Sequence, residues 1–245
     1  MSTFFTDSRR TIIPDLSSED GPLPPLLVTM TLVTGLVDAF SYLVLGHVFV
    51  ANMTGNVVFL GFAVAGAPGF SIGASVVALA SFWFGALIGG RIGSKHGKHR
   101  GRLLSTTATI QAVLLGVAVI VTVFSGSPIT AGFRYPLIAV LGLAMGLQNA
   151  AARKLAVPDL TTTVLTLTIT GTAADSAFGG GKGSKAGRRL IAVTAMLLGA
   201  LVGAALVVHV HIVYPLVIAL IAIASVAATT GVLGRSNPTW VRVES

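Results

Sequence analysis

Long apolar stretches dominate this chain, and several of them have the length of a membrane-spanning helix. Their approximate positions are 26–45, 48–66, 71–90, 103–124, 135–152, 160–174, 189–208 and 212–233. A helix needs roughly 20 apolar residues to cross a hydrocarbon core about 30 Å thick. Only 10% of the 245 residues are charged, whereas a soluble domain carries about 25%. The sequence therefore predicts an all-α integral membrane protein whose first partner is the lipid bilayer.

A weak internal repeat relates the two halves of the chain at a spacing of 111 to 114 residues. The matching pairs are Gly35-Leu-Val-Asp38-Ala with Gly146-Leu-Gln-Asn149-Ala, Met53-Thr-Gly-Asn56 with Leu165-Thr-Leu-Thr168, and Gly85-Ala-Leu-Ile-Gly89 with Gly199-Ala-Leu-Val-Gly203. Internal repeats decide how a fold is interpreted. The predicted domains are a mobile cytoplasmic tail (1–25), a first membrane repeat (26–124), a linker (125–134), a second repeat (135–233) and a cytoplasmic tail (234–245).

The distribution of basic residues favours six crossings over eight. The stretches 48–66 and 160–174 are the most polar of the apolar segments and occupy the same place in each repeat. If both enter and leave the membrane on one side, fifteen of the sixteen Lys and Arg residues face the cytoplasm, and only Arg134 lies outside. This asymmetry agrees with the positive-inside rule. Eight crossings would separate the basic loops 91–102 and 182–189, and a model in which only 48–66 also spans remains open.

Three crossings in each repeat would invert the second repeat relative to the first. The predicted fold is therefore about six transmembrane helices in two inverted three-helix repeats, each with a broken or re-entrant polar segment. Inverted repeats with broken helices near the midplane are a recurrent design of transporters. On this basis we expect the segments around Thr54 and Thr166 to approach each other near the midplane, with both termini in the cytoplasm.

Four motifs resemble the YoaK-like family of bacterial inner-membrane proteins. They are Gly35-Leu-Val-Asp38-Ala, Asn52-Met-Thr-Gly-Asn56, Ala144-Met-Gly-Leu-Gln-Asn149-Ala and Asp159-Leu-Thr-Thr-Thr163. The likeness covers about residues 26–233. It implies about six membrane helices and a bacterial plasma-membrane location. The family is a domain of unknown function, so the resemblance implies little about the substrate.

Asp38 is the acidic residue that lies deep in an apolar segment, with no Lys or Arg at comparable depth. A charged carboxylate there costs at least about 2.5 kcal/mol, so it needs a proton, a cation, water or hydrogen-bond donors. A proton or cation site and a purely structural polar anchor are equally compatible with this position. The predicted solute or ion pathway comprises Asp38, Asn52, Thr54, Gly55, Asn56, Asn149, Thr163 and Thr166.

Other features predict packing rather than chemistry. Gly85, Gly89, Gly199 and Gly203 have the Gly-xxx-Gly spacing that lets membrane helices approach closely. The chain has no cysteine, and no residue pattern indicates a catalytic constellation, a metal site or a cofactor. The positive charge lies between apolar segments, which indicates membrane topology rather than nucleic-acid binding.

The sequence thus predicts a secondary transporter or permease for a small polar solute, proton- or cation-coupled through Asp38, and not an enzyme. The alternative is a non-catalytic membrane scaffold or partner-binding protein in which the polar motifs only stabilise packing. A homo-oligomer is compatible with either function. A hydrated cavity at Asp38 and Asn56 would favour transport, and dry packing there would favour the scaffold.

Overall fold

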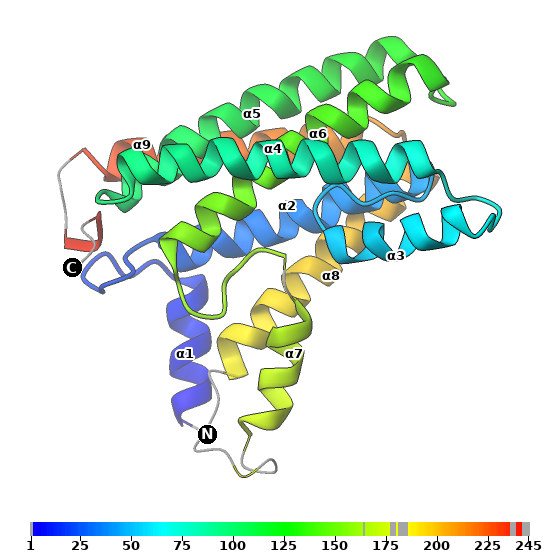
Figure 1. Cartoon of the computed structure of the whole chain (residues 1–245). Coiled ribbons are helices and arrows are strands. Elements are labelled where there is room, and N and C mark those ends of the chain that lie inside the picture. The colour runs from blue at the N-terminus through cyan, green and yellow to red at the C-terminus, as the bar shows by residue number, and fades with distance from the viewer. Residues whose placement is uncertain (1, 164, 177–179, 181–185, 236–238, 242–245) are drawn as a thin grey trace.

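The described part of the chain consists of helices joined by turns and loops in the computed structural model, which covers residues 2–163, 165–176, 180, 186–235 and 239–241 (Figure 1). The elements in order are α1 (Ser2–Ile12), α2 (Leu23–Val44), α3 (Met53–Val64), α4 (Ile72–His96), α5 (Arg100–Ser125), α6 (Ala131–Leu155), α7 (Leu165–Ala174), α8 (Ala186–His209), α9 (Tyr214–Leu233) and the short 3₁₀ helix η2 (Thr239–Val241). The all-α prediction is confirmed.

Six of these helices are long and apolar enough to cross a membrane, namely α2, α4, α5, α6, α8 and α9. The two polar segments form the short helices α3 and α7, of 12 and 10 residues. At 1.5 Å per residue such helices extend only about 15–18 Å, roughly half of a hydrocarbon core. Six helices are therefore long enough to cross the membrane and α3 and α7 are not, in agreement with the prediction from the charge pattern.

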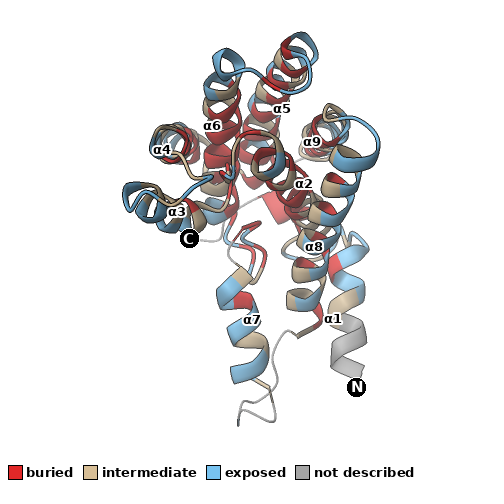
Figure 2. Ribbon diagram, turned by 90° about the vertical axis from the view of Figure 1, so that its right-hand side faces the viewer, coloured by how far each residue is buried: buried red, intermediate tan, exposed pale blue. Residues whose placement is uncertain are grey.

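The helices α2 and α6 form the centre of the bundle. About 61% of the apolar window in each is buried, against 22–33% in the other four long helices. Large apolar side chains face outward from the outer helices, among them Trp83, Phe124 and Leu197. Figure 2 shows buried residues concentrated where the helices face one another and exposed residues on the outside. An apolar exterior suits a protein whose solvent is lipid, because lipid tails are as apolar as the core.

Each central helix packs closely against a helix from the other half of the chain. Gly199 and Gly203 of α8 lie against the backbone of Leu32 and Leu36 in α2. A Cβ atom added to Gly199 would lie 2.1 Å from the carbonyl oxygen of Leu32, so only glycine fits there. Residue numbers rise together along this contact, and α2 and α8 therefore run in the same direction.

The helices α4 and α6 repeat this contact. Gly85 and Gly89 of α4 lie against the backbone of Leu143 and Leu147 in α6. The reciprocal glycine, Gly146 of α6, would place a Cβ 2.0 Å from the carbonyl oxygen of Phe82. These two helices also run in the same direction. The Gly-xxx-Gly motifs thus lie at contacts between the halves of the chain.

The helices α5 and α9 close the bundle in opposite directions. The hydroxyl of Ser105 donates to the carbonyl of Ala227 over 3.3 Å, and Gly101 near the start of α5 faces Gly234 just after α9. Along this contact residue numbers fall in α9 as they rise in α5, so the two helices are antiparallel. The interpretation of the two halves as inverted repeats stays a prediction.

The ends of the chain pack on the bundle. The segment expected as an N-terminal tail contains α1, which contacts α8 and α2. In the C-terminal segment the indole of Trp240 is buried against Gly21 and Gly101. The described residues of both terminal segments therefore lie at the same end of the bundle as the start of α5.

Candidate functional site

The predicted site residues of the first half gather around the carboxylate of Asp38. After α2 ends, residues 45–52 fold back beside its last turns. The amide N–H groups of Val50 and Ala51 donate to Asp38 Oδ1 over 3.0 and 2.9 Å, and the side-chain amide of Asn52 donates to Oδ2. Asp38 is only 4% exposed. The buried carboxylate therefore satisfies backbone donors that the irregular segment leaves free, as buried polar groups require.

Asn56 fixes the same segment one turn further on. The N–H of Phe49 donates to Asn56 Oδ1 over 2.9 Å, and the Asn56 amide donates back to the Phe49 carbonyl. Gly55 lies against the ring of Phe49, which an added Cβ would approach to 2.7 Å. Phe49 in turn stacks on Tyr42 with ring centroids 5.1 Å apart. Asn56 and Gly55 thus hold the returning segment against α2 and α3.

The second half contains a counterpart of this anchor. The hydroxyl of Thr163 donates to Asn149 Oδ1, and the Asn149 amide donates to the carbonyl of Met145 over 2.9 Å. The loop between α6 and α7 has positive φ angles at three residues that are not glycine, Ala156, Asp159 and Thr162. Such angles cost energy and persist only where surrounding contacts enforce them.

Arg189 of α8 holds the far side of this loop. Its guanidinium forms ion pairs with Asp159 at 2.8 Å and with Asp175 at 2.7 Å. These pairs join the loop and the end of α7 to α8. The sequence analysis did not identify them, because acid and base are far apart in the sequence and only the fold brings them together.

The two anchors do not form one shared site. Thr54 and Thr166 are both exposed, and α3 and α7 make no contact within the part of the chain that is described. Figure 1 shows α3 beside the end of α2 and the start of α4, and α7 at the opposite end beside the start of α8. The expected approach near the midplane is therefore wrong. Each returning segment reaches only as far as Asp38 or Asn149, each six residues, or about 9 Å, from the end of its own helix.

A buried polar cluster lies between the anchors. Gln148 of α6 accepts a hydrogen bond from Gln111 of α5 over 2.6 Å and donates to Thr34 of α2 over 2.9 Å. The three residues are at most 1% exposed, and Gln111 Oε1 has no partner among the described residues. The sequence analysis missed Gln111 and Gln148, although an amide in the middle of an apolar segment is a signal for such a cluster.

A cavity of about 620 Å³ opens beside the Asn149 anchor, between α4 and α6. The residues that line it are Phe82, Ala86, Gly90, Gly93, Asn149, Ala150, Arg153, Lys154, Thr161 and Thr163. The lining combines an apolar wall from α4 with an amide, two hydroxyls and two cationic side chains. Pockets of this size with a few convergent polar groups are typical of small-molecule sites. None of the described cavities includes Asp38 or Asn56.

Comparisons with known proteins agree with the membrane architecture. The model of a family described as "Protein of unknown function (DUF1275)" matches residues 26–229. The UPF0700 transmembrane protein YoaK of Bacillus subtilis (strain 168) is 36% identical over 146 residues. That match spans 59% of this chain and 63% of the length of the relative. No solved structure matches the chain.

Proposed function

Because the chain belongs to the DUF1275 family of membrane proteins, for which no function is described, we propose a function from its own geometry: a permease for a small polar solute. The observation that carries this proposal is the cavity at Asn149 and Thr163. It lies between two membrane-spanning helices and touches both members of a polar anchor. A scaffold has no need of such a space.

The directions of the helices support an inverted pair of repeats. α5 follows α4 after a short turn and runs back along the bundle, and α9 does the same after α8. Since α5 and α9 run in opposite directions, so do α4 and α8. The shared directions of α2 with α8 and of α4 with α6 then make α6 opposite to α2. We infer that the second half is an inverted copy of the first, the arrangement that secondary transporters use for alternating access.

The positive-inside rule places the Asn149 anchor toward the cytoplasm of a bacterial plasma membrane, with both termini on that side. The Asp38 anchor then lies toward the outside. In this proposal the cavity is the inward-facing half of the pathway, and the closed Asp38 anchor is its outward counterpart. Coupling of a proton or cation to transport at Asp38 is part of the same proposal.

The burial of Asp38 and Asn56, which are 4% and 0% exposed, is the observation that favours the alternative, a membrane scaffold. A screen of solute uptake by the purified protein in reconstituted vesicles separates the two functions. The permease predicts uptake of at least one small polar solute above the rate of protein-free vesicles. A scaffold predicts equal rates for every solute.

A further inference from the structure

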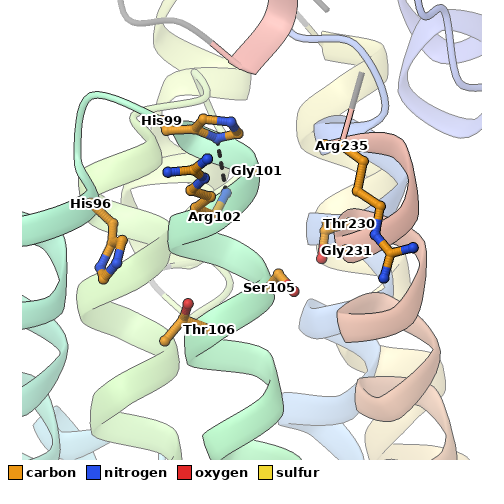
Figure 3. A pocket seen from close by; sticks show the side chains of 10 residues that line it. His96, His99, Gly101, Arg102, Ser105, Thr106, Thr230, Gly231 and Arg235 are labelled. Carbon is orange, nitrogen blue, oxygen red and sulfur yellow. Dashed lines mark hydrogen bonds between the residues drawn. The ribbon is translucent and has the colours of Figure 1, made fainter. Parts of the chain in front are cut away.

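A second hollow, of about 360 Å³, lies where the start of α5 meets the end of α9 (Figure 3). It is separate from the cavity at Asn149 and shares no lining residue with it. Figure 3 shows Arg102 on α5 and Arg235 just after α9 on the two sides of the gap between these helices, with Ser105 between them. Two membrane-spanning helices thus form a polar hollow at one end of the bundle.

Among the described residues, the side chains that line this hollow carry positive charge and no negative charge. Arg102 and Arg235 line it, and no carboxylate does. Elsewhere in the bundle Arg100, Arg188 and Arg189 each lie within 4 Å of an aspartate. Within the described ranges no acidic group comes that close to Arg102 or Arg235. These two guanidinium groups are therefore available to an anion from outside the described residues.

Further polar groups line the same space. The ring of His96 lines the hollow, and its buried Nδ1 has no hydrogen-bond partner in the described part of the protein. Ser105 contributes a hydroxyl whose only described bond, to Ala227, is long at 3.3 Å. The hollow also lies at the first turn of α5, where backbone N–H groups favour negative charge. His99 caps this turn by accepting from the N–H of Arg102 over 3.1 Å.

We propose that this hollow binds a phosphate group. Arg102 and Arg235 supply positive charge on the two sides of the hollow, a guanidinium group suits phosphate oxygens, and the hydroxyl and imidazole supply neutral bonds. The positive-inside rule assigns this end of the bundle to the cytoplasmic side, where basic pockets between membrane helices hold lipid head groups. The phosphate is carried either by an anionic phospholipid or by a soluble ion, and the two sources present the same chemistry to the site.

The test is the melting temperature of the purified full-length protein in neutral detergent, titrated separately with phosphatidylglycerol, phosphatidylcholine and inorganic phosphate. A ligand that binds the folded state raises this temperature with its concentration. The pocket variant is Arg102→Gln with Arg235→Gln. The matched control is Arg91→Gln with Lys95→Gln. It removes the same charge from two exposed positions of α4 at the same end of the bundle, and neither position lines the hollow.

The proposal predicts that the pocket variant loses at least about tenfold in apparent affinity, because hydrogen bonds between charged groups are among the strongest in proteins. The control should keep the affinity of the native protein. Stabilisation by phosphatidylglycerol alone identifies a lipid head group, and stabilisation by inorganic phosphate identifies a soluble ion.

An equal loss in the two double variants would overturn the proposal, since it would show that only net charge matters. So would a native protein that neither phosphatidylglycerol nor inorganic phosphate stabilises. Should the double variant not fold, Arg235→Gln alone carries the test, because Arg235 is exposed and lies after the end of α9.

Discussion

Asn52 donates a side-chain hydrogen bond to Asp38 fourteen residues earlier in the chain, and Thr163 donates one to Asn149 across the same separation. In each half the donor lies in the segment that returns toward the helix. The acceptor lies six residues before the end of α2 or α6. The repeat in the sequence therefore corresponds to a repeated contact: in each half, a polar side chain of a long helix binds the segment that leads into the following short helix.

The first prediction separates the hydrogen bonds of Asp38 from its charge. Asp38→Asn keeps an oxygen acceptor for Val50 and Ala51, and Asn52 can rotate its amide to face the new one. Asp38→Leu leaves buried N–H groups unsatisfied, at a cost of about 1–3 kcal/mol each. We expect Asp38→Asn to melt close to the native temperature and Asp38→Leu to melt clearly lower in detergent. Equal melting of the two variants would show that these hydrogen bonds do not hold the segment.

A second prediction concerns the glycine contacts between the halves. Gly146→Ala would place a methyl group 2.0 Å from the Phe82 carbonyl oxygen, so α4 and α6 must separate. Overpacking of this kind costs about 1–3 kcal/mol. The matched control is Gly116→Ala in α5, where an added Cβ meets open space. Thermal unfolding should show a loss for Gly146→Ala and none for Gly116→Ala; the reverse order would refute the close approach of these helices.

The third prediction uses the buried amides of Gln111 and Gln148. Replacing either one with Leu leaves the other without its 2.6 Å partner inside the bundle, a loss of about 1–3 kcal/mol. Replacing both removes the polar atoms together. The double variant should therefore be less destabilised than the sum of the two single variants. Additive losses in a double-mutant cycle would mean that the two amides act independently.

A fourth prediction fixes the orientation in the membrane. The chain has no cysteine, so single cysteines report their own exposure. Ser94 near the end of α4 and Ser127 in the turn after α5 are both exposed, at opposite ends of the bundle. In intact cells an impermeant thiol reagent should label Ser127→Cys and not Ser94→Cys. Labelling of position 94 alone would reverse the topology. Ser184, in the other basic loop, lies outside the described residues.

Periodic and compositional signals predicted the framework well. Segment lengths and the positions of Lys and Arg predicted six long helices and two short ones, and the Asp38 and Asn149 motifs each contact a folded-back segment. The approach of Thr54 to Thr166 was predicted wrongly, because sequence spacing does not say how deeply a returning segment penetrates. The Gln111–Gln148 bond and the Arg189 ion pairs depend on contacts between distant segments, which one sequence does not reveal.

The measurement that tests the central claim most directly is solute flux through vesicles that contain Gly90→Leu. Gly90 lines the cavity, and an added side chain there meets no atom within 4 Å of its Cβ. The variant should fold and yet fill part of the space beside Asn149. Gly116→Leu makes the same change on a membrane helix away from the cavity.

For any solute that the native protein transports, the permease account predicts a large loss of uptake in Gly90→Leu and native uptake in Gly116→Leu, at equal amounts of folded protein. Native uptake in both variants would contradict the assignment of this cavity to the pathway. Uptake that never exceeds that of protein-free vesicles, for any solute and for the native protein itself, would contradict transport altogether.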